Sequence, residues 1–147
     1  MGKKLLLLFV LIFVCPASTL SAKENASYKI AVFPSGTKIK MEMANTDALR
    51  QKGLMFRDHL DKGTGMLFVF TVPAPHRFWM KNCKFPIDIL WLNQKKQIVY
   101  LVEAVPPCLE DPCPDYGPTQ EKALYVIETN AGFAKKEKLK HGLVIRF

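Results

Sequence analysis

Polar and apolar residues alternate from Lys38 to Met43, a pattern that predicts a β-strand with one buried face. Ile39, Met41 and Met43 would share the buried face, and the charged residues between them would face solvent. The segment Met66–Phe70 is instead a continuous apolar run, which is typical of a strand covered on both faces.

Similar short apolar segments predict five more strands, at Tyr28–Pro34, Ile87–Leu92, Ile98–Val105, Ala123–Thr129 and Leu143–Phe147. The polar residues 93–97 separate two of these segments and have the length of a hairpin loop. We therefore expect strands 87–92 and 98–105 to pair antiparallel.

Helical signals are few and short. They are a cap at Asn45 or Thr46 with Gly53 at the far end, and a stretch from Asn130 or Ala131 to Lys140 that stops at Gly142. A chain of 147 residues suits one domain. The expected fold is mainly β, a small antiparallel β-sandwich or a partly open barrel with one or two short helices.

The N-terminus has the pattern of a secretory signal peptide. Lys3 and Lys4 precede an unbroken apolar run, Leu5–Val14, which is followed by small and polar residues up to Ala22. A helix that spans a bilayer needs about 20 apolar residues, and this run is much shorter. We expect residues 1–22 to be a signal peptide, cleaved near Ala17–Ala22, and residues 23–147 to form a single exported domain, periplasmic or extracellular.

Cys15 offers a minor alternative, in which a lipid attached to this cysteine anchors the protein to a membrane. The preceding Phe13 and Val14 are bulkier than the small residues that such processing requires. Cleavage without lipid attachment is therefore the preferred interpretation.

The chain is basic, with a formal net charge of +8. Its densest positive segment contains Lys135, Lys136, Lys138 and Lys140, with His141. No aromatic residues are interleaved there, as a groove for single-stranded nucleic acid would require. We expect no nucleic-acid partner, at most peripheral contact with a membrane, and a solvated surface for these lysines.

Three cysteines remain after the leader. Cys108 and Cys113 lie in a proline-rich loop, and in an oxidising compartment a local disulfide is the simplest state for them. A redox-active pair is the alternative, although the spacing is not Cys-x-x-Cys. Cys83 would remain a free thiol. The histidines show no ligand spacing that would complete a zinc site with these cysteines, so no metal and no cofactor are expected.

Five motifs occur in order along the chain: Gly53-Leu54-Met55-Phe56-Arg57, Gly65-Met66-Leu67-Phe68, Phe78-Trp79-Met80-Lys81-Asn82, Pro86-Ile87-Asp88-Ile89-Leu90 and Glu128-Thr129-Asn130-Ala131-Gly132. In order and spacing they resemble the DUF192 family, also called UPF0127, from about Tyr28 to Phe147. The resemblance implies one compact, mainly β domain that is often exported and whose biochemical role is unassigned. It supplies no catalytic residues. Cys83 departs from the threonine often found there in the family.

The large apolar residues of these motifs, Met55, Phe56, Met66, Phe68, Phe70, Phe78, Trp79, Met80 and Trp91, are expected to form the core. Trp79 could in addition serve as a platform for a flat ligand. The polar candidates for ligand binding are Arg57, Lys81, Asn82, Asp88 and Glu128, together with Trp79.

Asp88 would share a strand face with Leu90 and Leu92, where an unpaired buried carboxylate is costly. That face meets solvent near Asp88, or a cation such as Arg57 or Lys81 pairs with it. An ion pair is the preferred interpretation, ahead of a ligand-facing pair. Glu128 could in turn lie near the amide groups that open the helix following its strand.

Three classes of function fit these residues. The preferred one is a non-catalytic, envelope-associated binding or accessory module, in which a patch of Trp79, Arg57, Lys81 and Asn82 recognises a small polar, anionic or carbohydrate ligand. The second is a hydrolase of an envelope polymer that uses Asp88 and Glu128 about 5–10 Å apart. The third is a structural domain that binds an envelope protein through a sheet edge.

Overall fold

The computed structural model describes residues 26–147. The predicted signal peptide, its cleavage region and Cys15 lie outside these residues. Within the described part of the chain, no helix is long and apolar enough to cross a membrane.

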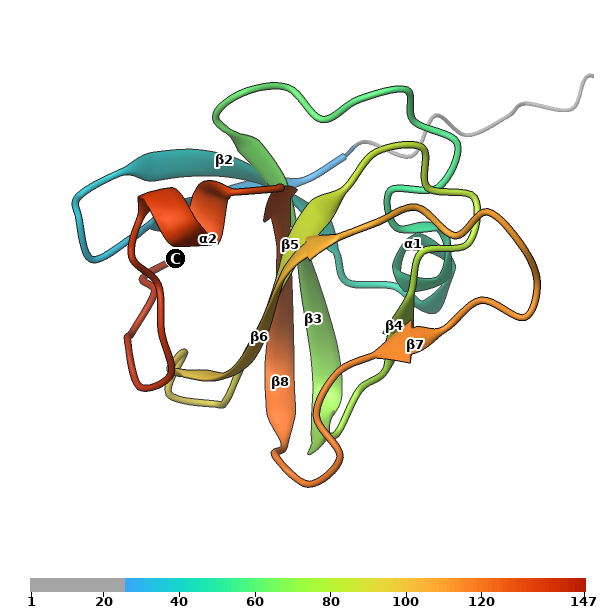
Figure 1. Ribbon diagram of the computed structural model, residues 1–147. Coiled ribbons are helices and arrows are strands. Elements are labelled where there is room, and N and C mark those ends of the chain that lie inside the picture. The colour runs from blue at the N-terminus through green and yellow to red at the C-terminus, as the bar shows by residue number, and fades with distance from the viewer. Residues whose placement is uncertain (1–25) are drawn as a thin grey trace, which may run out of the picture.

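Six strands form one sheet in the order β1-β2-β3-β8-β5-β6 (Figure 1). Their bounds are β1 Tyr28–Val32, β2 Lys38–Ala44, β3 Thr64–Ala74, β5 Ile87–Leu92, β6 Ile98–Val105 and β8 Ala123–Asn130. Two short strands, β4 Phe78–Trp79 and β7 Asp115–Tyr116, pair separately. The mainly β class is confirmed, and the sheet is open rather than closed into a complete barrel.

The sheet is mixed rather than wholly antiparallel, because β2 and β3 run parallel. Parallel neighbours cannot be joined by a tight hairpin and need a crossover connection. Here the crossover is residues 45–63, which contain α1, Asp47–Lys52. The hairpin predicted between β5 and β6 is confirmed, with Leu90 opposite Leu101.

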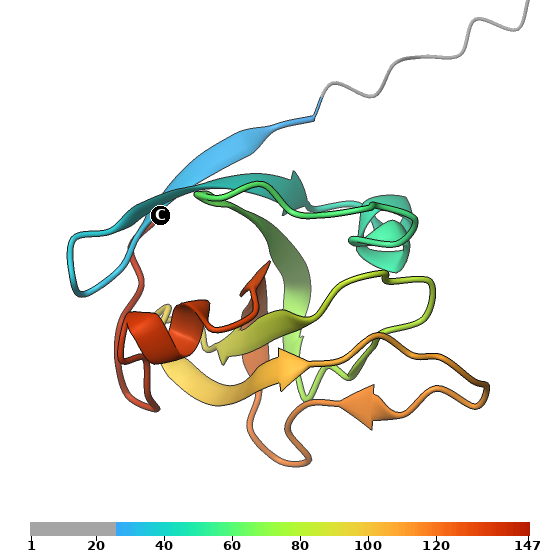
Figure 2. The ribbon, with the colours of Figure 1, turned by 45° about the horizontal axis from the view of Figure 1, so that its top comes forward.

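Both faces of the sheet are covered, and each carries a core. The first core lies under α2, Phe133–Lys136, and contains Phe33, Met41, Leu67, Leu90, Leu92, Ile127, Ala134 and Ile145 among its buried residues. The second core lies under α1 and the β4–β7 pair, and contains Leu54, Met66, Phe68, Met80, Ile87, Ile89, Trp91 and Val126. Figure 2 shows α2 on one side of the curved sheet and α1 on the other, as does Figure 1.

Of the nine residues predicted as core, four are buried (Met66, Phe68, Met80 and Trp91), three are partly buried and two are exposed. The side chain of Phe56 is 66% exposed and that of Trp79 is 52% exposed. Phe56 has a positive φ of 66° and donates its N–H to the carbonyl of Asn82. The turn after α1 therefore directs this side chain outward instead of into the core.

The first helix begins where the sequence predicts. The Thr46 hydroxyl accepts the N–H of Leu49 at 3.2 Å, and Gly53 ends the helix with a φ of 46° and an N–H bonded to the Leu49 carbonyl. The second helix is shorter than predicted. Strand β8 extends to Asn130, and Lys138 has a positive φ of 52°, so only residues 133–136 are helical.

The C-terminal segment forms single bridges where a strand was expected. Val32 of β1 bridges Arg146, and Gln97 at the start of β6 bridges Val144. Because β1 and β6 are the two edges of the sheet, this segment joins both edges by backbone hydrogen bonds. The open sheet is thereby held in a curved shape around the first core.

Candidate functional site

A cavity of about 530 Å³ opens on the side of the sheet that carries the second core. We call it the α1 cavity. Its walls come from α1 and the residues that follow it, from β3, from β4 and from β8. The lining residues are Asp47, Arg50, Gln51, Lys52, Gly53, Leu54, Met55, Phe68, Phe70, Arg77, Phe78, Trp79, Cys83 and Glu128. Its volume lies within the range of small-molecule sites.

Glu128 is the buried polar group of this cavity. It lies opposite Met66 on β3 and Ile89 on β5, so its side chain projects from the same face as the second core. The residue is only 5% exposed, and its Oε2 has no hydrogen-bond partner among the described residues. A buried polar atom without a partner is rare in native proteins and points to a missing ligand or water.

Burial raises the pKa of Glu128 to about 8, and the guanidinium of Arg57 opposes the shift only in part. The carboxyl group is therefore mostly protonated at neutral pH. A protonated carboxyl has one O–H to donate and an oxygen to accept. Glu128 thus offers a neutral donor at the buried end of the cavity.

Cys83 shares the cavity with Glu128 and is the free cysteine of the described residues. Burial, followed by the nearby Glu128, raises the pKa of its thiol to about 11. A thiol with such a pKa is almost entirely protonated at neutral pH and is a weak nucleophile. At neutral pH Cys83 therefore presents a protonated thiol to the cavity.

One wall of the cavity is aromatic and belongs to the β4–β7 pair. Phe78 packs edge-on against Phe68 at 4.9 Å and against Trp91 at 5.8 Å, which fixes the position of β4. Arg77 secures the pair by bonding Asp115 and the Gly117 carbonyl. Trp79, the next residue after Phe78, is half exposed and lies against the open side of the cavity.

Cations outnumber anions in the lining. Arg50, Lys52 and Arg77 are positive, and Asp47 is the one carboxylate besides Glu128 among the lining residues. Asp47 is exposed and pairs with Arg50, whose other nitrogen donates to the Val69 carbonyl at 2.7 Å. With Glu128 protonated, the cavity carries a net positive charge, which attracts anions.

Two of the six candidate ligand-binding residues, Trp79 and Glu128, meet in the α1 cavity. Arg57 makes a bidentate ion pair with Glu42 at 2.8 and 3.0 Å and lines a second, smaller cavity of about 270 Å³. Lys81 binds Asp111 at 3.1 Å, with its ammonium 5.7 Å from the Trp79 ring centre. Within the predicted patch, Lys81 therefore stays near Trp79, whereas Arg57 lies at a different cavity.

Asn82 acts through its backbone. Its φ is 58°, a left-handed conformation in which asparagine is more common than most residues, and its carbonyl accepts the Phe56 N–H at 2.9 Å. It joins the loop after β4 to the turn after α1, the two segments that border the cavity.

Asp88 is fully buried and holds the backbone around α2 together. Its carboxylate accepts the N–H of Ala134 at 2.7 Å, of Gly132 at 3.2 Å and of Ala104 at 2.7 Å. The predicted ion pair with Arg57 or Lys81 is wrong, because backbone amides satisfy the carboxylate instead. The helix-opening amides that we expected near Glu128 also belong to Asp88.

Asp88 and Glu128 do not share a pocket. In the β5–β8 register, Asp88 lies opposite Thr129 and Glu128 lies opposite Ile89, so the two carboxyl groups project from opposite faces of the sheet. The paired-carboxylate arrangement of a glycoside hydrolase requires both groups on one side of a bound substrate.

Cys108 and Cys113 are joined in a disulfide with a Cα–Cα distance of 5.6 Å. Within residues 26–147, their sulfur atoms and an Asp111 oxygen form the one cluster of potential metal ligands. The disulfide removes both thiolates as metal ligands. It closes the loop that leads into β7, next to the aromatic wall of the cavity.

Sequence reasoning missed several lining residues, chiefly Arg50, Lys52 and Arg77. Arg50 and Lys52 were recognised only as part of a helix. The motif Gly53-Leu54-Met55 was the available signal, because it lies directly after that helix. Its position beside Glu128 depends on the crossover between the parallel strands, which no local pattern encodes.

The match to a known family model shows to which protein family this chain belongs. The model of the DUF192 family, described as "Uncharacterized ACR", matches residues 30–147. The chain belongs to the DUF192 family. No curated protein matches the DUF192 chain described here.

Two solved structures are similar to this DUF192 domain. A protein from Sinorhizobium meliloti 1021, with the description "putative transcription regulator", is 28% identical with a TM-score of 0.72, over 82% of this chain and 94% of its own. A protein of unknown function from Novosphingobium aromaticivorans DSM 12444 is 25% identical with a TM-score of 0.73, over 86% of this chain and 89% of its own. The likeness extends over nearly the whole described domain.

Proposed function

We propose that this DUF192 domain is a non-catalytic, envelope-associated binding module that takes a small organic anion with an apolar body in the α1 cavity. The observation that supports this most strongly is Glu128 Oε2, which is buried at the cavity and has no hydrogen-bond partner within residues 26–147. A ligand that accepts a hydrogen bond from the protonated carboxyl would satisfy it.

The lining favours an anion with an apolar body over a neutral sugar. Phe68, Phe70 and Phe78 give the inner wall an aromatic surface. Arg50 and Arg77 are already paired with carboxylates, which leaves fewer side chains free for the many hydroxyl groups of a sugar. Lys52 makes no ion pair with a described residue and is exposed at the end of α1. It can meet the charged end of the ligand while the apolar body lies against the aromatic wall.

A binding role is favoured over a catalytic one because the cavity lacks a second suitably placed acid or base. Asp88 projects from the other face of the sheet. Asp47 is exposed and paired with Arg50, and the Cys83 thiol is held in its protonated form. General acid–base catalysis requires a partner within hydrogen-bond reach of the reacting group.

Calorimetric titration of the protein with benzoate, benzamide and glucose at pH 6.5 tests this function. We expect benzoate to bind more tightly than benzamide, and glucose not to bind. Lys52→Ala should weaken benzoate binding about fivefold, whereas Lys140→Ala, a matched change of an exposed lysine outside the cavity lining, should have no effect. Trp79→Ala should weaken both aromatic probes.

Equal affinity for benzoate and benzamide would refute the preference for anions, and glucose binding that is lost in Trp79→Ala would favour the carbohydrate alternative. The absence of binding by all three probes would refute a small-ligand role for this cavity. A domain that binds proteins through a sheet edge would then be the better explanation.

We also propose export through the predicted leader at residues 1–22. The disulfide between Cys108 and Cys113 supports this, since disulfides persist mainly in oxidising compartments. Cell fractionation followed by mass spectrometry of the mature N-terminus should find an exported chain that begins near residue 23. A lipid-modified N-terminal Cys15 would support the lipoprotein alternative, and an unprocessed cytosolic chain would refute export.

A further inference from the structure

Cys83 and Cys108, the latter a member of the disulfide, meet at one backbone carbonyl. The N–H groups of Cys83 and Cys108 both donate to the Met80 oxygen, at 3.1 and 3.4 Å. Both side chains also pack against the second core. A disulfide requires Cα atoms about 4.4–6.8 Å apart, and two residues whose amides share one acceptor can lie within this range.

We propose that this protein has a thiol–disulfide exchange site, in which Cys83 attacks Cys108 and the chain alternates between a Cys108–Cys113 and a Cys83–Cys108 disulfide. The sulfur of Cys83 forms a bond with the sulfur of Cys108, and the Cys108–Cys113 bond breaks. The Cys83 sulfur is oxidised and the Cys113 sulfur is reduced. The proton of the Cys83 thiol ends on Cys113, so no external oxidant or reductant is required.

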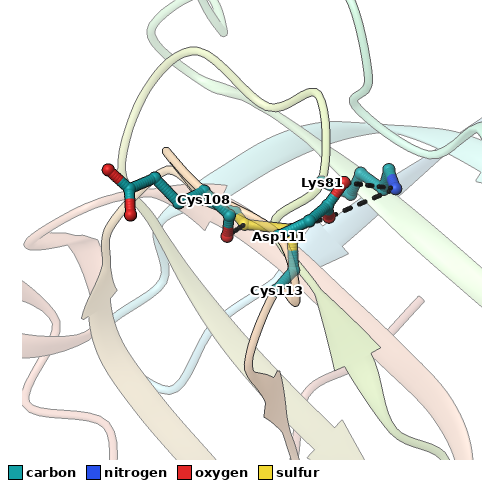
Figure 3. A network of polar contacts seen from close by, with 5 residues as sticks. Lys81, Cys108, Asp111 and Cys113 are labelled. Atoms are coloured by element: carbon teal, nitrogen blue, oxygen red, sulfur yellow. Dashed lines mark hydrogen bonds and ion pairs between the residues drawn. A yellow bond between two sulfur atoms is a disulfide. The ribbon is translucent and has the colours of Figure 1, made fainter.

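An ion pair links the two loops that carry the cysteines. The Cys113 sulfur lies 3.5 Å from an Asp111 oxygen, and the Lys81 ammonium binds both oxygens of that carboxylate at 3.1 and 3.2 Å. Figure 3 shows Lys81 reaching the disulfide loop through Asp111. This contact holds the loop of Cys83 against the loop of Cys108 and Cys113.

Exchange would change the walls of the α1 cavity. Cys83 would turn from the cavity toward Cys108, and Cys113 would no longer secure the loop that enters β7. Because β7 pairs with β4, the position of Trp79 would become less constrained. This effect on ligand binding rests on the proposed function, whereas the exchange itself does not.

Disulfide mapping of the full chain provides the test. Burial raises the pKa of the Cys83 thiol to about 11, so exchange is slow at neutral pH, and the measurement reads the pairing at equilibrium. The protein is incubated in a glutathione redox buffer, quenched with acid and digested with trypsin. Cys83 falls in peptide 82–84, and Cys108 and Cys113 both fall in peptide 97–122. Exchange therefore appears as a cross-link between the two peptides, and Cys15 cannot contribute to it.

The variant Cys113→Ser should accumulate the cross-link between peptides 82–84 and 97–122, because Cys108 then has Cys83 as its neighbour. The matched variant Cys108→Ser leaves Cys83 and Cys113, which share no acceptor, and we expect at least tenfold less cross-link. The wild-type protein should contain the same cross-link as a minor species.

Two results would overturn the proposal. One is that Cys113→Ser keeps Cys83 and Cys108 as free thiols while circular dichroism shows a native fold. The other is equal cross-linking in the two variants, which would indicate random collision. If either variant fails to fold, the wild-type measurement decides, and a wild-type digest without the cross-link refutes exchange. Failure of benzoate binding would leave these results unaffected, so the two proposals are separately testable.

Discussion

The buried carboxyl of Glu128 makes the stability of the protein depend on pH in a direction opposite to that of most acidic groups. Glu128→Gln keeps the size of the side chain and removes its titration. Because the pKa of Glu128 is raised from 4.5 to about 8, the folded state binds a proton that the unfolded state releases between these values. Wild-type stability relative to the glutamine variant is therefore highest below pH 4.5, falls as the pH rises toward 8, and is constant above it.

The size of this effect follows from the pKa shift. Each pH unit between the unfolded and folded pKa values changes stability by about 1.4 kcal/mol. From pH 5 to pH 8 the wild-type protein should therefore lose about 4 kcal/mol relative to Glu128→Gln. Since a domain of this size is stable by about 5–15 kcal/mol in total, the loss is large enough to measure directly.

Urea unfolding at pH 5, 6, 7, 8 and 9, followed by tryptophan fluorescence, gives the free energy of unfolding of each protein. Subtracting one curve from the other removes the contributions of other titrating groups. Glu103→Gln, on the exposed side of β6, provides the matched control for a change in formal charge. A difference between wild type and Glu128→Gln that stays constant from pH 5 to pH 9 would refute a buried, protonated Glu128.

Three further predictions follow from single contacts. Asp88→Ala leaves three backbone N–H groups without their acceptor and should lower the free energy of unfolding by about 3–5 kcal/mol. Asp88→Asn keeps one acceptor oxygen, so its free energy of unfolding should fall less in the same urea assay. Gly65→Ala places a Cβ 2.6 Å from the Met41 sulfur and 2.7 Å from the Glu128 carbonyl oxygen. Thermal unfolding should therefore show that the free energy of unfolding falls by about 1–3 kcal/mol. An unchanged melting temperature would contradict this packing. Iodoacetamide at pH 8 should label one thiol per molecule within residues 26–147, and the labelling should be slow because burial raises the pKa of Cys83. Reduction should expose two more thiols. Three rapidly labelled thiols before reduction would contradict the disulfide.

Strand positions were predictable from the sequence because side chains alternate along a strand that has one buried face. The bounds of β5 and β6 agree with the apolar segments, and Thr46 caps α1 as expected. The extent of α2 was not predictable, because the positive φ of Lys138 reflects how the chain packs after β8 rather than a local propensity. The β4–β7 pair joins residues 78–79 to residues 115–116, a distance in sequence that no local pattern spans.

The candidate site was predictable only in part. Glu128 and Trp79 were found because a carboxyl group and a large aromatic ring within the DUF192 motifs are informative residue types. Asp88 was assigned an ion pair, since the sequence does not show that a bulge at Ala104, with a φ of 50°, turns an amide toward it. Which face of the sheet a carboxyl occupies depends on the register between strands, and that register placed Asp88 and Glu128 on opposite sides.

The parallel arrangement of β2 and β3 has a consequence for how this fold can be modified. The chain leaves β2 at Ala44 and must return to the opposite end of the sheet before β3 can start at Thr64, so a long excursion is obligatory. Residues 45–63 make that excursion and also supply one side of the α1 cavity. The shape of this cavity can therefore be changed by redesigning this single segment, while the hydrogen-bonded framework of the sheet remains as it is.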